Sequence, residues 1–293
     1  MAANVGIRKP VNFSIKAFLK LTRIQNLLII GLTQYLTAIF LVGPKTLWWK
    51  YMSSLELLML SSSTILIAAA GYIINDYYDV KIDYINKPER VIVGKVLKRR
   101  IVMAAHTIFN VVGIAMGFWL MPRLGLVNFL AALWLWLYSN QLKRLPFIGN
   151  FSVALLTGLS IAVVALYYQE HELLIYTYAV FAFAITLIRE IIKDMEDLKG
   201  DATFGCKTLP ILFGIARTKM LEYVLLIMFV GLLVMMAIEI DREVLENFFL
   251  FMIFPVIYFI IRLARADNRK DFAFLSLYCK LLMLAGVLSM MFF

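Results

Sequence analysis

Cysteine and histidine are nearly absent from this chain of 293 residues, which contains two of each. Cys206 and Cys279 are too few and too far apart for a disulfide framework or a zinc site. His106 and His171 stand alone, so a metal held by histidine is not expected. Charged residues are also scarce, at 16% of the chain. These shortages exclude the disulfide-stapled and zinc-binding classes of small protein.

Apolar residues are abundant instead. They make up 62% of the sequence, and the mean hydropathy is +0.84. A soluble domain of this length cannot bury so much apolar surface, because a single core stops growing at about this size. The net charge of +10 does not indicate nucleic acid as a partner, since the basic residues form no patch apart from the segments between apolar runs. The expected partner for most of the surface is a lipid bilayer.

Nine apolar stretches are long enough, or nearly so, to cross a bilayer. They are predicted at Ile24–Val42, Leu55–Ile74, Ile101–Met121, Leu124–Tyr138, Phe151–Tyr168, Leu173–Ile192, Met220–Ile240, Val244–Leu263 and Phe272–Phe293. The first run is too long for a signal peptide, and Pro255 is expected to kink the eighth span. We predict an all-α polytopic fold in one integral-membrane domain, residues 1–293.

The distribution of Lys and Arg predicts how this domain is oriented. With the N-terminus in the cytoplasm, 24 of the 29 basic residues lie in inside segments and four in outside segments. The remaining one, Lys280, lies within the last span. Two alternatives remain for its side chain: it lines the cavity, or it snorkels to the membrane interface. Basic residues gather on the cytoplasmic side of membrane proteins. We therefore expect a cytoplasmic N-terminus, an outside C-terminus and a location in the cytoplasmic membrane of the cell.

Two aspartate motifs follow the second and sixth spans. In each, three aspartates stand at i, i+3 and i+7, which places their carboxylates on one stripe of a helix. The members are Asp76, Asp79 and Asp83 in the first motif, and Asp194, Asp197 and Asp201 in the second. One constant offset of 118 residues relates the two sets. This repetition predicts two pseudo-repeated halves, with the motifs near residues 75–83 and 194–201.

Such stripes suit a hard divalent cation. Like charges at helical spacing repel one another unless a cation neutralises them. Mg²⁺ prefers oxygen ligands and commonly binds a few carboxylates together with substrate phosphates. Two facing stripes could hold metal ions that grip a diphosphate. A solvated acidic loop, or a duplicated motif with only a structural role, remains the alternative that the residues leave open.

Both motifs resemble the signatures of the UbiA-type intramembrane prenyltransferase superfamily. Further matches are Arg23-Ile24-Gln25-Asn26, Tyr138-Ser139, Lys143-Arg144, Gly149-Asn150 and Lys207-Thr208-Leu209-Pro210. The resemblance covers the whole chain. It implies nine helices around a central cavity that is capped on the cytoplasmic side and open laterally to lipid. It also implies transfer of a prenyl group from a polyprenyl diphosphate donor to a lipophilic acceptor.

The resemblance also assigns residues to roles. The implied Mg²⁺ ligands are Asn75, Asp76, Asp79, Asp83, Asp194, Asp197 and Asp201, of which Asp79, Asp83, Asp197 and Asp201 are the expected catalytic residues. The implied substrate-binding residues are Arg23, Asn26, Tyr138, Lys143 and Arg144. Aromatic faces can favour an allylic cation, and Tyr72, Tyr77, Tyr78 and Tyr138 are the candidates for this.

The segment after the first motif bears on the acceptor. The run from Asp83 to Arg90 resembles the extension in the branch of digeranylgeranylglyceryl phosphate synthases and chlorophyll synthases. This branch commonly continues Pro-Ile-Pro-Ser-Gly, whereas the chain reads Val91-Ile92-Val93-Gly94-Lys95. We expect geranylgeranyl diphosphate as donor and geranylgeranylglyceryl phosphate as acceptor, which gives an ether lipid.

Other functions remain open at this point. Within enzymes, the acceptor could be an aromatic or quinone precursor or a chlorin. A secondary transporter is the alternative from another class, because internal repeats and intramembrane acids occur there too. A non-catalytic lipid-binding protein is a third. The acids here lie at the ends of spans rather than at the bilayer midplane, which favours the enzyme.

Overall fold

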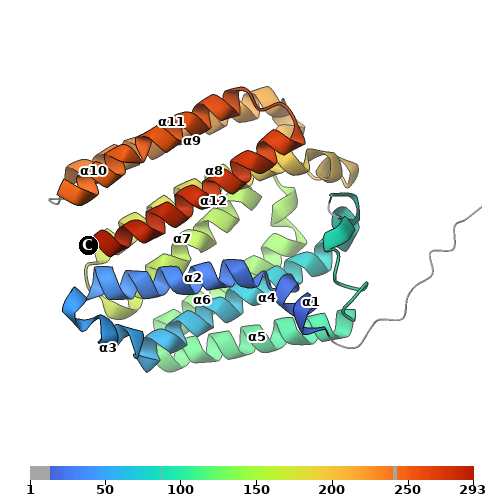
Figure 1. Cartoon of the computed structure of the whole chain (residues 1–293). Coiled ribbons are helices and arrows are strands. Elements are labelled where there is room, and N and C mark those ends of the chain that lie inside the picture. Colours follow the sequence, from blue (N-terminus) through green and yellow to red (C-terminus); the bar gives the residue numbers. More distant parts are fainter. Residues whose placement is uncertain (1–13, 87, 240–242) are drawn as a thin grey trace, which may run out of the picture.

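Long helices lie side by side, and most run from one end of the molecule to the other (Figure 1). This computed structural model describes residues 14–86, 88–239 and 243–293. The start of the predicted cytoplasmic N-terminal segment, Lys87 and Arg242 lie outside the described residues. Helix α1 lies at one end of the molecule, and the C-terminus lies at the other (Figure 1).

The described residues are almost entirely helical, and their only β-type contact is an isolated bridge between Val93 and Leu97. A π-helical turn, Thr37–Val42, continues the second helix. The helices are α1 Ile15–Leu21, α2 Ile24–Leu36, α3 Trp48–Met52, α4 Leu55–Asn86, α5 Arg99–Leu120, α6 Pro122–Asn140, α7 Ile148–Tyr168, α8 Glu172–Thr203, α9 Leu209–Glu239, α10 Glu243–Phe251, α11 Ile253–Ala264 and α12 Arg269–Ser289. The all-α prediction is confirmed for this part of the chain.

Eight helical segments in the described ranges are long and apolar enough to cross a membrane. Each corresponds to a predicted span. The fourth predicted span, α6, is not among them. It has 19 residues, but Arg123, Asn128 and Asn140 dilute its apolar character. The count of nine therefore stays a prediction.

The eighth span is broken where its proline predicts a kink. Helix α10 ends at Phe251 and α11 begins at Ile253. Pro255 has no backbone N–H to donate to the carbonyl of Phe251, and its ring crowds that carbonyl. The chain therefore turns at Met252 and resumes a helix, as membrane helices commonly do at proline.

The two helices that carry the motifs extend well beyond their predicted spans. The apolar runs end at Ile74 and Ile192, yet α4 and α8 continue to Asn86 and Thr203. Both helices have 32 residues. The first aspartate of its motif is residue 22 of α4 and residue 23 of α8. The stripes thus lie on helices, as the spacing predicts.

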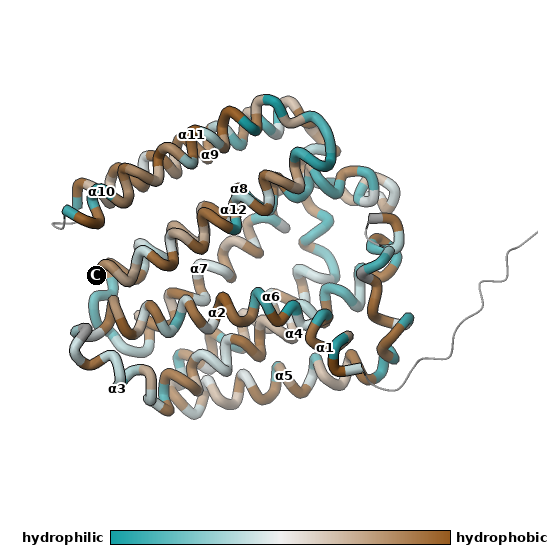
Figure 2. Tube along the Cα trace, viewed as in Figure 1, coloured by the Kyte–Doolittle hydropathy of each residue, from teal (hydrophilic) through white to brown (hydrophobic). Residues whose placement is uncertain are grey.

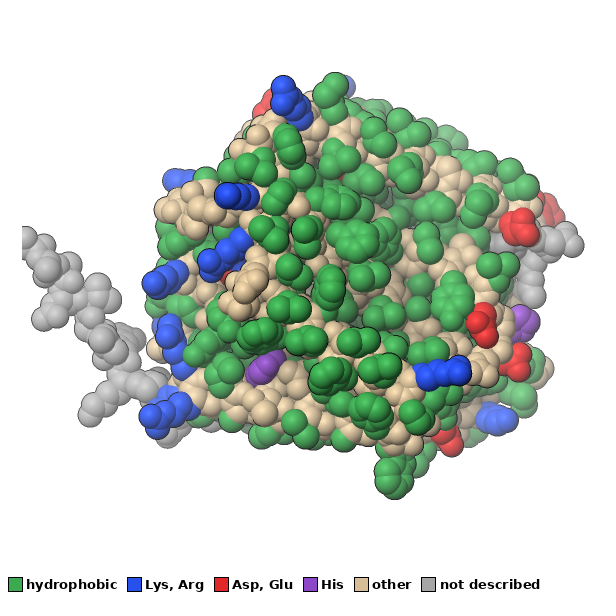
Figure 3. Space-filling model, turned by 180° about the vertical axis from the view of Figure 1, so that it is seen from behind, with side chains coloured by type: hydrophobic (Ala, Val, Ile, Leu, Met, Phe, Trp, Pro, Cys, Tyr) green, Lys and Arg blue, Asp and Glu red, His purple; other side chains and the backbone are tan. Residues whose placement is uncertain are grey.

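An apolar band surrounds the molecule. Hydrophobic residues follow the middle of the helices, and hydrophilic ones gather at the ends (Figure 2). On the face seen in Figure 3, most Lys and Arg side chains lie at the end that holds α1, and most Asp and Glu lie at the opposite end. A lipid bilayer is the solvent that suits such a band.

The loop after the first motif folds back as an apolar cap on α4 and α5. Val91, Ile92 and Val93 are buried, and Ile92 and Val93 belong to a cluster with Leu21 and Val102. This burial accounts for the β-branched residues Val91 and Val93 at the two positions where the related branch commonly has proline. Burying each such side chain stabilises the fold by about 1.5–3 kcal/mol.

Helix α7 approaches α8 closely at one glycine. A Cβ on Gly158 would lie 2.8 Å from the carbonyl oxygen of Ala179, whereas a Cβ on Gly231 of α9 would meet no atom within 4 Å. The α7–α8 contact matters because α8 carries the second motif.

These two glycines provide a matched test of the packing. We expect Gly158→Ala to destabilise the protein by about 1–3 kcal/mol, because the backbone of α8 must move away. Gly231→Ala is expected to be neutral or to stabilise the helix by up to about 1 kcal/mol. Thermal unfolding in detergent, followed by tryptophan fluorescence, measures both. Equal melting temperatures for the two variants would contradict this packing.

Candidate active site

Basic side chains neutralise the carboxylates of the first motif. Arg23 Nη2 lies 2.8 Å from Asp76 Oδ1. The Lys143 ammonium forms a close ion pair with Asp79 and lies 3.5 Å from Asn75 Oδ1. All four partners of these pairs were predicted as site residues. Sequence positions far apart thus meet at the end of α4 that lies nearest α1.

Arg23 is held in place by its own backbone and by Tyr72. It occupies the junction of α1 and α2 with φ 53°, a left-handed conformation that costs a non-glycine residue about 1–3 kcal/mol. Its guanidinium lies 4.8 Å from the centre of the Tyr72 ring. Asn26 donates a hydrogen bond of 3.4 Å to the Tyr72 hydroxyl. A cation–π contact and an ion pair therefore fix one guanidinium on two sides.

The second motif is held by a neutral partner. The side-chain amide of Asn150, near the start of α7, donates a hydrogen bond of 2.8 Å to Asp194 Oδ2. The preceding residue, Gly149, allows α7 to approach the turn at Leu142–Arg144. A Cβ there would lie 3.0 Å from the Lys143 Cα. The start of α7 thus contacts both the lysine of the first motif and the aspartate of the second.

Backbone hydrogen bonds around Cys206 join the end of the second motif to the turn that holds Lys143 and Arg144. The Lys207 amide donates to the Arg144 carbonyl at 2.8 Å, and the Cys206 amide donates to the Asp201 carbonyl at 3.0 Å. The Cys206 thiol interacts electrostatically with Asp201, Arg144, Asp79 and Lys143. Burial, followed by the Asp201 carboxylate, raises the pKa of this thiol. Cys206 is therefore a poor nucleophile, but it marks the point where both motifs converge.

Tyr138, at the end of α6, lies between the motifs. Its hydroxyl interacts electrostatically with Asp79, Asp194 and Arg23. The side chain of Asp194 in turn interacts with Asp201. The predicted residues Arg23, Tyr138, Lys143 and Asp194 thus form one polar centre. Asp83 and Asp197 lie on the same two helices.

Oxygen donors in this centre are suited to a divalent cation. Within the described ranges, no three His, Cys, Asp or Glu side chains gather closely enough to hold a metal. In the first motif, Asp76 and Asp79 form ion pairs with Arg23 and Lys143 instead of gathering around one point. Asn75 Oδ1 and Asp79 Oδ1 nevertheless converge on one cation, the Lys143 ammonium. This is the donor chemistry that Mg²⁺ prefers.

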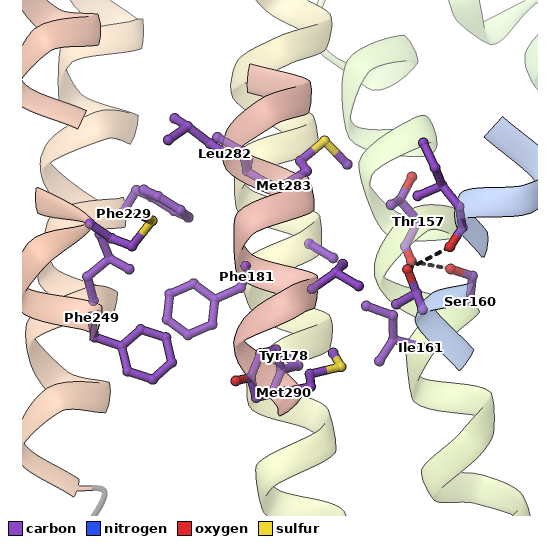
Figure 4. A pocket seen from close by; sticks show the side chains of 18 of the residues that line it. Thr157, Ser160, Ile161, Tyr178, Phe181, Phe229, Phe249, Leu282, Met283 and Met290 are labelled. Carbon is purple, nitrogen blue, oxygen red and sulfur yellow. Dashed lines mark hydrogen bonds between the residues drawn. The ribbon is translucent and has the colours of Figure 1, made fainter. Parts of the chain in front are cut away.

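An apolar pocket lies in the same bundle as the polar centre, and α7 and α8 contribute residues to both. Its walls come from α2, α7, α8, α9, α10, α11 and α12. Figure 4 shows Phe181 of α8 between Ile161 on one side and the pair Phe229 and Phe249 on the other. The rings of Phe181 and Phe249 are nearly parallel, with centroids 5.9 Å apart. Such a lining suits a hydrocarbon chain.

Residues 31–284 match the model of the UbiA prenyltransferase family. The chain belongs to this family.

Relatives and solved structures agree with that assignment. A digeranylgeranylglyceryl phosphate synthase from Thermococcus gammatolerans is 35% identical over 200 residues, which cover 68% of this chain and 70% of the relative. A structure from work on digeranylgeranylglyceryl phosphate synthase in membranes has a TM-score of 0.67 at 25% identity, covering 94% of this chain and 96% of the other. A UbiA homologue from Archaeoglobus fulgidus, bound to DMAPP and Mg²⁺, shares the fold with a TM-score of 0.64 at 17% identity and covers 94% and 99%.

Several residues of this prenyltransferase near the site were not predicted as site residues. Asn150 was noted only as part of a family match. Arg189 and Glu190 form an ion pair on α8, and Glu222 of α9 is fully buried and interacts electrostatically with Asp194. The positions of these charged residues within apolar spans could have identified them, because charges there are costly and are usually functional.

Asn150 allows a test of the second motif. We expect Asn150→Leu to lower prenyltransferase activity about 10- to 100-fold, because residues that orient metal-binding or catalytic groups have effects of this size. Asn128→Leu is the matched control. Asn128 is also buried, and its amide donates a hydrogen bond of 3.0 Å to Gly113, within the α5–α6 pair. Activity per folded molecule, measured by product formation, should fall only in the first variant. An equal loss in both would mean that Asn150 serves the fold alone.

Proposed function

We propose that this prenyltransferase transfers a geranylgeranyl group from geranylgeranyl diphosphate to geranylgeranylglyceryl phosphate, giving an ether lipid and diphosphate. The observation that carries the proposal is that both aspartate motifs and Lys143 converge in a bundle that also encloses an apolar pocket. The 35% identity to the synthase from Thermococcus gammatolerans supports the choice of acceptor.

Mg²⁺ is the proposed cofactor. The proposed ligands share oxygen donors and lie on two helices: Asn75, Asp76, Asp79 and Asp83 on α4, and Asp194, Asp197 and Asp201 on α8. The homologue from Archaeoglobus fulgidus, which is bound to DMAPP and Mg²⁺, supports a divalent cation here. When bound, the metal neutralises negative charge on the diphosphate. Asp79, Asp83, Asp197 and Asp201 remain the proposed catalytic residues.

Basic residues of the site stabilise the negative charge of the leaving diphosphate. The bond between the allylic carbon and the diphosphate oxygen breaks, and its electron pair leaves with the diphosphate. Arg23, Lys143 and Arg144 are proposed to stabilise this anion. The acceptor hydroxyl then forms the new carbon–oxygen bond and releases its proton. Tyr72 and Tyr138 present aromatic rings beside the reacting carbon, and Asn26 holds the Tyr72 hydroxyl.

The apolar pocket is proposed to hold the prenyl chain. Its few polar side chains include Thr157 and Ser160, and the Ser160 hydroxyl donates to the Thr157 carbonyl at 2.7 Å (Figure 4). Little polar surface is left for water. A dry cavity protects an allylic cation from hydrolysis until the acceptor captures it.

We place the active site on the cytoplasmic side of a cytoplasmic membrane. The gathering of basic side chains at the end with α1 supports this orientation (Figure 3). The C-terminus lies at the opposite end (Figure 1), as an odd number of crossings requires, which supports counting α6 as a ninth span. The equal lengths of α4 and α8 support two pseudo-repeated halves.

The reaction is tested by product analysis. Purified protein with Mg²⁺, geranylgeranyl diphosphate and geranylgeranylglyceryl phosphate should release diphosphate and form a doubly alkylated glyceryl phosphate, identified by mass. EDTA should abolish the product. Asp79→Asn and Asp197→Asn should each lower the rate about 100-fold or more, because each removes charge that holds the reacting diphosphate.

A control and the other outcomes complete that test. Asp267→Asn removes a carboxylate that is 86% exposed and pairs with Lys219, so its rate should stay within about twofold. Product with an aromatic acceptor or a chlorin, and none with the glyceryl phosphate, would keep the enzyme class but refute the acceptor. Solute uptake by proteoliposomes without diphosphate release would favour a transporter.

Orientation is tested by labelling introduced cysteines on intact cells. Glu172 and Lys270 are exposed, while the native Cys206 and Cys279 are buried. A membrane-impermeant maleimide should label Glu172→Cys directly and Lys270→Cys only after permeabilisation. The reverse pattern would invert the proposed topology.

A further inference from the structure

Lys280 is a cation in the middle of a membrane helix. It is residue 12 of the 21 in α12, and its side chain is exposed. Among the described residues it forms no salt bridge. A lysine at this depth is costly in lipid and normally faces a polar or water-filled cavity. Its neighbour Cys279 is fully buried on a helix that packs along α8.

The charges that act on Lys280 are mainly positive. Its ammonium interacts electrostatically with Arg189, then Lys193, then Arg23, and only last with Glu190. Arg23 is already paired with Asp76. We call Arg189, Lys193 and Lys280 the basic cluster. Two helices far apart in the sequence, α8 and α12, thus direct cations toward one region.

Two cations of the basic cluster share one salt-bridge partner, and Lys280 forms no salt bridge among the described residues. Arg189 forms a close ion pair with Glu190, and Lys193 Nζ lies 3.7 Å from the same carboxylate. Arg189 and Lys193 thus share the Glu190 carboxylate, while Asp194 and Asp197, which are proposed metal ligands, also act on Lys193. Arg189 Nε is also buried without a hydrogen-bond acceptor among the described residues. A phosphate monoester carries about −1.5 to −2 charges at neutral pH, so it offers negative charge to Lys280 and acceptor oxygens to the buried Arg189 Nε.

The basic cluster lies where a lipid head group would meet its chain. Ile185 precedes Arg189 by one turn of α8, and Met283 follows Lys280 by one turn of α12, and both line the apolar pocket. Lys143, by contrast, lies with Asn75 and Asp79 of the first motif. The site thus offers two groups of cations, one around the first motif and one on α8 and α12 near the pocket.

We propose that Lys280, with Arg189 and Lys193, binds the phosphate of the lipid acceptor, separately from the cations that hold the diphosphate of the donor. This inference rests on the proposed function and adds acceptor-recognition residues to it. Lys280 is then a determinant of specificity, because it distinguishes a phosphorylated acceptor from a neutral one.

The test compares two acceptors in Lys280→Gln and in the matched variant Lys280→Arg. The acceptors are geranylgeranylglyceryl phosphate and its dephosphorylated counterpart, geranylgeranylglycerol. In Lys280→Gln, the KM for the phosphorylated acceptor should rise about 10- to 100-fold, the loss expected for one charged hydrogen bond. The KM for the donor should stay within about twofold. The preference for the phosphorylated acceptor should fall by the same factor, and Lys280→Arg should keep most of it.

Three results would overturn the inference. They are a rise in the donor KM instead, an equal loss with both acceptors, and unchanged kinetics in Lys280→Gln. If that variant does not fold, Lys280→Met replaces it, because an apolar side chain suits a membrane helix. Failure of the proposed function is seen separately, since the wild-type protein itself would then not use geranylgeranylglyceryl phosphate.

Discussion

Carboxylates inside a membrane domain are stable only where other groups compensate them, and this constraint organises the whole active-site end of the molecule. Ion pairs with Arg23 and Lys143 compensate Asp76 and Asp79, and a hydrogen bond from Asn150 compensates Asp194. Each partner comes from a different element. The α1–α2 junction, the α6–α7 turn and the start of α7 are therefore held against α4 and α8 by the same contacts that place the reacting groups.

The same pairing prepares the site for its substrate. Around the first motif, two aspartates and two basic side chains already balance in charge. If a metal–diphosphate complex bound as proposed, Asp76 and Asp79 would hold the metal and supply negative charge to it, and the freed Arg23 and Lys143 would hold the phosphates, so the charge of the region would change little. Because the cations are positioned before the substrate binds, little reorganisation is needed when negative charge develops on the leaving group. The left-handed backbone of Arg23 is a cost that this arrangement offsets.

The sequence was sufficient for features that depend on local pattern. The apolar runs predicted the membrane helices, and the i, i+3, i+7 spacing of aspartates predicted that α4 and α8 continue as helices beyond the lipid. The pairing of these aspartates could not be predicted, because Arg23–Asp76 and Lys143–Asp79 join positions 53 and 64 residues apart. Arg189 and Glu190 were overlooked because they sit among apolar neighbours, one turn before the second motif. The burial of Val91–Val93 likewise depends on tertiary contacts that a comparison with proline-containing loops does not reveal.

The apolar pocket has a consequence for how the protein is made. Its wall includes Ile29, Ile30 and Thr33 from the first membrane helix, and Leu282, Met283 and Val287 from the last. A chain that emerges from the ribosome N-terminus first cannot close this wall until its final helix has entered the bilayer. Until then the half-built cavity is open to membrane lipids, whose own chains can fill it. Assembly therefore ends with α12 displacing lipid, and the enzyme acquires its binding site in the last step of its insertion.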